Sequence, residues 1–186
     1  RSGGQFIASG LVVRDTRSWS AEPRFGRGLD VSHGAQAEVA RVVFERNRDV
    51  AIYASDAGTS VTLREVVVRE TRSGESDNAR GRGVDAWDGA TVSLARSAIE
   101  NNRECALFAT GTGSTLALSE VVVRDTVGRE SDRAGGMGLQ ASSGAAASVS
   151  RSLFERNRRA AFIVEHTGTS LGLEDVVVRD TRSQES

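Results

Sequence analysis

The sequence predicts an all-β fold in which short strands wind into a parallel β-solenoid, and three observations lead to this prediction. One phrase of seven residues recurs at a constant interval along the chain. Apolar and polar residues alternate with a period of two, which is typical of strands and not of helices. Glycines recur at matching positions, where turns between strands are expected. We therefore expect a single domain over residues 1–186 that is a segment of a longer repeat array.

The repeated phrase, EVVVRDT in its third copy, sets the period. Its copies start at Gly10, Glu65, Glu120 and Asp175, which defines a 55-residue repeat. A related phrase, RVVFERNR, starts at Arg41, between the first two copies and nearer to the second. Each 55-residue unit therefore splits into two coils of unequal length, where a coil is one full turn of the solenoid. The longer coil carries an extra loop, such as residues 71–83.

Three short strands are expected in each coil, because three sets of apolar residues recur in step. The inward residues of the first strand are Ala37/Val39, Val61/Leu63, Val92/Leu94, Leu116/Leu118, Ala147/Val149 and Leu171/Leu173. Those of the second strand are Phe44, Val68, Ile99, Val123, Phe154 and Val178. Those of the third are Leu29/Val31, Ile52/Ala54, Val84/Ala86, Leu107/Ala109, Leu139/Ala141 and Phe162/Val164. Stacked coils would bring each set together as a ladder inside the solenoid.

The stretch GLDVSHGAQAEVARVVFERN, residues 28–47, resembles one coil of the right-handed parallel β-helix proteins of the pectate-lyase-like superfamily. The resemblance covers essentially the whole chain, and it implies right-handed winding and an extracellular or cell-surface location. Proteins of this fold include lyases, hydrolases, epimerases, phage tailspikes and non-catalytic surface proteins, so the fold alone does not choose a function.

A leucine-rich repeat is the alternative fold. Residues 39–47 fit its phrase L-x-x-L-x-L-x-x-N. The leucine that should follow two residues later is absent, however, since Asp49, Glu104 and Arg159 stand there. No segment has the pattern of a helical convex side, which favours the β-helix.

Composition and charge exclude several function classes. The formal net charge is −1, which argues against a nucleic-acid partner. No apolar run approaches the roughly 20 residues of a membrane span. Cys105 is the only cysteine, so the chain can form neither an internal disulfide nor a thiolate cluster. We expect no cofactor and no metal.

Charged residues alternate in sign from coil to coil at three positions. The first column is Arg14, Glu45, Arg69, Glu100, Arg124, Glu155 and Arg179. The second is Arg41, Glu65, Arg96, Glu120, Arg151 and Asp175, and the third is Asp15, Arg46, Glu70, Asn101, Asp125, Arg156 and Asp180. Opposite charges one coil apart attract, and a slip by one coil would pair like charges. We interpret the columns as a device that specifies register.

Three further columns have open or structural interpretations. The stripe of Arg48, Arg72, Arg103 and Arg158 either pairs with nearby acids in water or binds an anion such as an acidic polysaccharide. The column of Val43, Val67 and Val122 either faces outward as an apolar stripe or belongs to the core. Asn47, Asn102 and Asn157 are predicted to form corners through local bonds.

A candidate ligand surface combines carboxylates with aromatic rings. Its residues are Trp19, Phe25, Asp30, Tyr53, Asp85 and Phe108. Two carboxylates two coils apart would be about 9.6 Å from each other, near the upper limit for inverting glycosidases. The aromatic rings could stack on a sugar.

A repeated sequence offers few singular residues for catalysis. His33 and His166, the only histidines, have no histidine one unit away, so they form no repeated site. We therefore predict a non-catalytic structural or interaction module whose partner is itself, stacked head to tail or laterally, or a glycan. The alternative is a carbohydrate-binding or polysaccharide-degrading β-helix.

Overall fold

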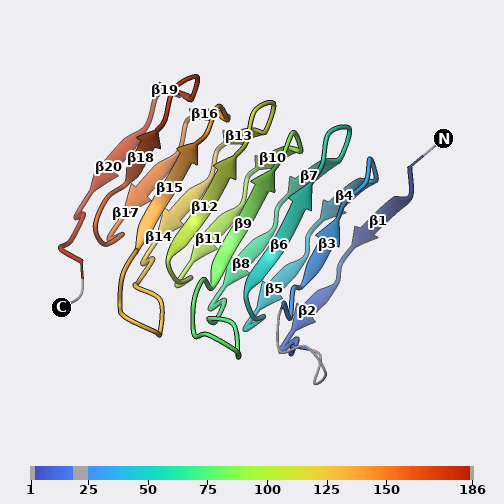
Figure 1. Ribbon diagram of the computed structural model, residues 1–186, viewed down its shortest axis with the longest axis horizontal. Helices are drawn as coiled ribbons and strands as arrows, with labels where there is room; N and C mark the ends of the chain where they lie inside the picture. Colours follow the sequence, from blue (N-terminus) through green and yellow to red (C-terminus); the bar gives the residue numbers. More distant parts are fainter. Residues whose placement is uncertain (1–2, 19–24, 185–186) are drawn as a thin grey trace.

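The computed structural model describes residues 3–18 and 25–184, and these residues form strands and turns without a helix (Figure 1). Twenty strands of this part gather into three sheets, in which every pairing is parallel. The chain passes from the first sheet to the second and third before it returns to the first, and this is the arrangement of a parallel β-helix. The predicted all-β parallel fold is thus confirmed.

Each sheet collects one strand from every coil. The first sheet holds β1 (Gln5–Ser9), β4 (Gln36–Ala40), β7 (Ser60–Arg64), β10 (Thr91–Ala95), β13 (Thr115–Ser119), β16 (Ala146–Ser150) and β19 (Ser170–Glu174). The second holds β2 (Val12–Arg14), β5 (Val43–Glu45), β8 (Val67–Arg69), β11 (Ala98–Glu100), β14 (Val122–Arg124), β17 (Leu153–Glu155) and β20 (Val177–Arg179). The third holds β3 (Leu29–Val31), β6 (Val50–Ser55), β9 (Arg82–Trp87), β12 (Cys105–Thr110), β15 (Met137–Ser142) and β18 (Phe162–Glu165).

The strands pair in the register that the apolar columns predicted. Leu63 of β7 pairs with Val39 of the preceding coil and with Leu94 of the following coil. The inward side chains of the inner coils form one continuous buried core. Leu173 and Val178 are exposed because they lie in β19 and β20, which pair with a described strand on one side only.

Glycine is the second residue of β9 and of β15 because the backbone there runs against the core. A Cβ at Gly83 would lie 2.5 Å from the carbonyl oxygen of Ala106 and 2.8 Å from Cγ2 of Ile99. Both distances are shorter than a carbon atom can accept, so any side chain would push β9 away from its neighbours. At the opposite end of the strand, Gly89 adopts a φ of 92° in the turn to β10.

Three asparagines bridge coils from inside the corner after the second sheet. Asn102 is fully buried, accepts a hydrogen bond from the Thr71 amide at 3.1 Å and donates one to the Val68 carbonyl at 3.1 Å. Asn157 does the same with the Thr126 amide and the Val123 carbonyl. The expectation of local bonds was wrong, because these partners lie 31 and 34 residues away. The asparagine side-chain amides therefore link neighbouring coils through hydrogen bonds.

The alternating charges form ladders of ion pairs along the solenoid. On the second sheet the shortest pairs join side chains that are 24 residues apart in the chain. They are Glu45–Arg69, Glu100–Arg124 and Glu155–Arg179, each at 2.6 Å. At the two corners that flank this sheet, the paired side chains are 31 residues apart. They are Glu65–Arg96 at 3.3 Å, Glu120–Arg151 at 3.5 Å, Asp15–Arg46 at 2.9 Å and Asp125–Arg156 at 2.8 Å.

The corner charges occupy strained backbone. Arg96, between β10 and β11, has a φ of 49°, and Asp125, after β14, has a φ of 57°. A left-handed conformation costs a side-chain-bearing residue on the order of 1 kcal/mol, so glycine or asparagine would fit the backbone better. Charged residues therefore stand at these corners for their ion pairs and not for their conformational preference.

The valine column of the second sheet lies on its outer side. Val43, Val67 and Val122 are half-buried, whereas Val66 and Val68, which flank Val67, are buried in the core. The column is therefore a partly covered apolar stripe between the charge ladders.

Candidate functional site

The outer side of the third sheet aligns most residues of the predicted ligand surface. Asp30 pairs with Tyr53, Tyr53 with Asp85, and Asp85 with Phe108, so the four form one column across β3, β6, β9 and β12. Their side chains leave the sheet opposite the core, because the residues before and after them point inward. This column is the centre of the candidate site.

Asp85 is the most unusual group in the column. Only 1% of it is exposed, and its Oδ2 atom is reached by the guanidinium of Arg82 and by the indole N–H of Trp87, each at 3.3 Å. Among the described residues, no hydrogen-bond partner reaches its Oδ1 atom. Burial raises the pKa of Asp85 to about 6, although the charge of Arg82 acts in the opposite direction. Such a carboxyl marks a candidate functional group on physical grounds.

Aromatic rings surround Asp85, and arginines lie against two of the three. Trp87 lies between Tyr53 and Phe108, with ring centroids 6.4 and 5.7 Å away. The guanidinium of Arg27 lies 3.5 Å from the centre of the Tyr53 ring, and that of Arg82 lies 4.1 Å from the centre of the Phe108 ring. These cation–π contacts occupy ring faces that a sugar would need for stacking.

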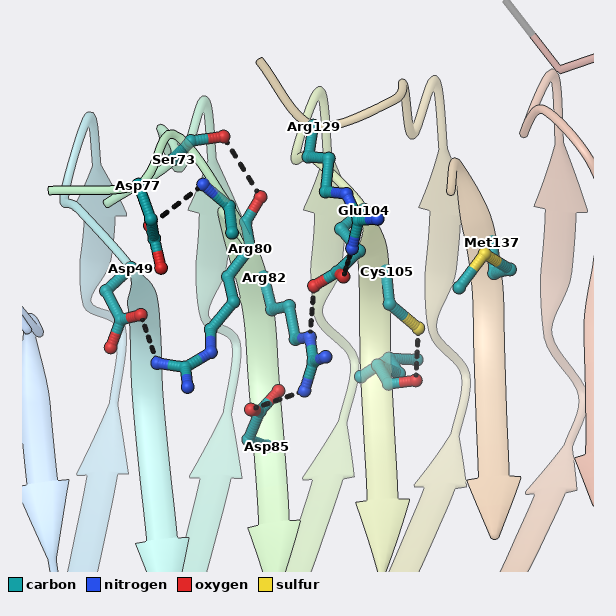
Figure 2. Close-up of polar contacts among 12 residues, drawn as sticks. Asp49, Ser73, Asp77, Arg80, Arg82, Asp85, Glu104, Cys105, Arg129 and Met137 are labelled. Carbon is teal, nitrogen blue, oxygen red and sulfur yellow. Dashed lines mark hydrogen bonds and ion pairs between the residues drawn. The ribbon is translucent and has the colours of Figure 1, made fainter. Parts of the chain in front are cut away.

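Arg82 connects the column to the loops above it (Figure 2). Its Nε atom donates to Glu104 at 2.6 Å, and Arg129, from the loop of residues 128–136, reaches the other oxygen of Glu104 at 2.9 Å. Burial lowers the pKa of Arg82, but the charges of Asp85 and Glu104 more than offset this, so the pKa stays above its ordinary value. The loop is thereby held down on the sheet by charge.

A second apolar cluster lies on this outer side, separate from the core. Cys105 and Met137 are buried against Phe108. The Cys105 thiol donates to the Leu107 carbonyl at 3.0 Å, and burial raises its pKa to about 12, so it stays protonated. Cys105 is thus a free and buried cysteine.

Phe25 and Asp30 are the most exposed of the described residues of the predicted surface. Trp19 lies outside the described residues. Phe25 is 46% exposed and contacts Arg27, with 4.4 Å from guanidinium to ring centre. The carboxylate of Asp30 is half exposed and pairs with Arg27 at 2.6 Å.

Sequence analysis missed the arginines that complete the site. Arg27 and Arg82 occupy the same position in successive repeats, each directly before a glycine that opens a strand of the third sheet. That recurrence was a usable signal. Their contacts with the rings, however, depend on how two neighbouring columns pack, which the sequence pattern does not contain.

The arginine stripe is largely matched by carboxylates. Arg48 pairs with Glu75 at 3.3 Å and Arg103 with Glu130 at 3.1 Å, both acids being in the long loops. Arg158 contacts the Ser183 carbonyl. Arg72 and Arg48 line a pocket of about 320 Å³ with Asp15 and Glu75, so acids accompany the bases there.

Comparisons of the chain with protein-family models, with curated proteins and with solved structures gave no match. In the described part of the chain, no helix has the length and apolar character needed to cross a membrane. Within residues 3–18 and 25–184, no three His, Cys, Asp or Glu residues gather as a group that could hold a metal ion.

Proposed function

We propose that the chain is a non-catalytic structural or interaction module, a segment of a repetitive β-helix. The observation that carries this proposal is the closure of the one chemically unusual cluster by the chain's own groups. Asp85 is buried, and Arg27 and Arg82 lie against Tyr53 and Phe108. A catalytic carboxyl must reach the atom that it protonates, and a sugar-binding ring must present a free face.

The finer architecture belongs to the same proposal. We infer right-handed winding, a 55-residue unit made of two coils, and membership of the pectate-lyase-like superfamily, with an extracellular or cell-surface location. Bonds between neighbouring coils alternate between offsets of 24 and 31 residues, as in Glu45–Arg69 and Glu65–Arg96, and this supports the two-coil unit. The winding, the superfamily and the location rest on the resemblance of residues 28–47 to a β-helix coil.

Carbohydrate binding or cleavage is the second candidate, and one observation favours it. Asp30 and Asp85 lie in one column with Tyr53 and Phe108, and strands two coils apart are separated by about 9.6 Å. The raised pKa of Asp85 would suit a general acid. Opening of the Arg82 contacts would be required before a glycan could reach it.

The two candidates can be separated by a reducing-sugar assay and a glycan array. We expect no release of reducing ends from neutral or acidic polysaccharides and no glycan retained on the array. Cleavage by the wild-type chain that is lost in Asp85→Asn or Asp30→Asn would overturn the non-catalytic proposal. Circular dichroism of both variants checks that a lost signal does not reflect unfolding.

Self-association can be argued from the ladders. Two copies stacked head to tail in register would place Arg179 opposite Arg14 and Asp180 opposite Asp15, which is repulsive. The ladders therefore oppose end-to-end stacking of this chain on itself, and we expect light scattering to give the mass of a monomer up to high concentration. A molar mass that grows steadily with concentration would contradict this.

A further inference from the structure

Two loops above the third sheet share a four-residue stretch that differs at one position, and outside this stretch the earlier loop has Arg80 where the later one has Gly135. Residues 74–77 read GESD, and the equivalent residues of the next repeat, 129–132, read RESD. In the later loop the guanidinium of Arg129 is held by two carboxylates. Asp132 binds it with both oxygens at 2.7 Å, and Glu104 accepts a third bond at 2.9 Å. This is the forked geometry that a guanidinium, and not an ammonium, can satisfy.

The earlier loop keeps both carboxylates but lacks an arginine at the position of Arg129, and its own Arg80 pairs with one of the two carboxylates, Asp49. Asp77 corresponds to Asp132, and Asp49, directly before β6, corresponds to Glu104, directly before β12. The loop backbone is alike, because Asp77 Oδ1 accepts the Ala79 amide at 3.0 Å just as Asp132 Oδ1 accepts the Ala134 amide at 2.9 Å. Gly74 stands where Arg129 would be.

A pocket lies beside Gly74 and Asp77. It has a volume of about 460 Å³ and is lined by Phe25, Asp49, Gly74, Ser76, Asp77 and Arg80. Asp49 is buried and paired with Arg80 at 2.8 Å through one oxygen and with Arg27 at 3.4 Å through the other, whereas Asp77 forms no ion pair with any described residue (Figure 2). The pocket therefore keeps one unmatched negative charge, next to the exposed ring of Phe25.

We infer that this pocket binds a guanidinium group, supplied by an arginine side chain of a protein partner. In the later loop Arg129 supplies a guanidinium group from the chain itself, and two carboxylates bind it. Asp77 offers its carboxylate to the fork, and Phe25, whose ring has the guanidinium of Arg27 4.4 Å from its centre, lines the same pocket. The inference goes beyond the structural module proposed above, because it assigns the kind of residue that docks on it.

The test is a titration of the ¹⁵N-labelled full chain with N-acetyl-argininamide, followed by NMR. We expect saturable shifts of the amides of Gly74, Asp77 and Ala79. N-acetyl-lysinamide should bind at least about fivefold more weakly, because an ammonium lacks the fork. No saturable shift with the arginine compound, or equal binding of the lysine compound, would refute the inference.

Three variants sharpen the test. Gly74→Arg restores the arginine within the chain and should abolish binding. A Cβ at Gly74 would come no closer than 3.2 Å to another atom, Asp77 Oδ1, and its φ is not left-handed, so a small shift of the Asp77 side chain makes room for it. Asp77→Asn keeps the acceptor for the Ala79 amide and should weaken binding about tenfold, a loss of roughly 1.4 kcal/mol. Asp132→Asn, the same change in the other loop, should leave the affinity unchanged. Undiminished binding by Gly74→Arg, or by Asp77→Asn if the first variant does not fold, contradicts the inference.

Sedimentation equilibrium shows whether the arginine belongs to a second copy of this chain or to a different protein. A dimer formed by the wild-type chain and lost in Gly74→Arg would place the arginine on a second copy. Monomers in both cases, together with binding of the arginine compound, would place it on a different protein.

Discussion

The outer sides of the second and third sheets follow opposite rules. On the second sheet and its corners, equivalent positions carry charges that alternate from coil to coil. On the third sheet Arg27 and Arg82 share a position, but its other equivalents are Val50, Cys105 and Met137, which carry no charge. Repetition therefore serves the pairing of coils, and the chemistry that distinguishes one coil from another lies where the repeat is broken.

On the second sheet and its corners, different interactions join neighbouring coils at the two offsets. Ion pairs on the second sheet join coils at an offset of 24 residues. The corner pairs and the buried asparagines join coils at an offset of 31 residues. The junctions at the two offsets are therefore held together by different interactions. The long loops lie between coils that are joined at the offset of 31 residues. At these junctions a buried asparagine amide adds hydrogen bonds between the coils.

The largest expected effect comes from removing one of these amides. Asn102→Ala would leave the Thr71 amide and the Val68 carbonyl buried without partners. Each orphaned group costs roughly 1–3 kcal/mol, so we expect a loss of about 2–5 kcal/mol in urea denaturation.

The adjacent asparagine is a matched control for this variant. Asn101 is exposed and has a φ of 54°, which glycine adopts without strain. Asn101→Gly should therefore change stability by less than about 0.5 kcal/mol. Equal losses in the two variants would show that the buried amide is not a tie between coils.

On the third sheet the expected effect depends on pH. The carboxyl of Asp85 has an ordinary pKa of 3.8 in the unfolded chain and about 6 in the folded chain. Between these values only the folded chain holds the proton, so the stability contributed by Asp85 is highest at low pH and falls as pH rises through this window. The fall is roughly 3 kcal/mol.

Asp85→Asn stays neutral at every pH and keeps an acceptor for the indole of Trp87. We expect its unfolding free energy, relative to wild type, to rise by about 3 kcal/mol between pH 4 and pH 7. Asp30→Asn, in the same column but half exposed, should show little of this rise. Parallel pH profiles for wild type and Asp85→Asn would mean that Asp85 is not buried as a neutral acid.

A smaller effect is expected from reversing one corner pair. Glu65→Arg places two positive charges together, since Arg96 lies 3.3 Å from the Glu65 carboxylate, and the reverse change Arg96→Glu places two negative ones. Each single variant should lose about 0.5–1 kcal/mol, and the double variant should regain most of it. Thermal unfolding at low and high salt measures this, and an additive double variant would show that the ladder does not set pairing.

Sequence reasoning performed best where the molecule repeats. Leu63 and Val39 could be placed in one column because strands have a period of two and coils a fixed length, and the register confirms it. The sign alternation at Glu100 and Arg124 could likewise be seen before any coordinates. Both are properties of a one-dimensional pattern that the fold copies directly.

The sequence pattern did not predict contacts that depend on how side chains of neighbouring columns pack. The reach of Asn102 to a neighbouring coil and the position of Arg82 on the Phe108 ring are set by side-chain directions at a corner. Asp85 is buried with Arg82 and Trp87 of its own strand bonded to it, and the strand's period of two does not predict that these side chains converge on it.

Because the charges alternate in sign, the ladders respond differently to the gain or loss of an odd and of an even number of coils. Gain or loss of a single coil would set like charges against each other in all three ladders at once, whereas gain or loss of two would leave every pair as it was. A gene that encodes such a rod can therefore lengthen or shorten by even steps at little cost in stability, and odd steps are penalised. The charge code, which aligns strands within one molecule, also limits the routes by which the molecule can evolve in length.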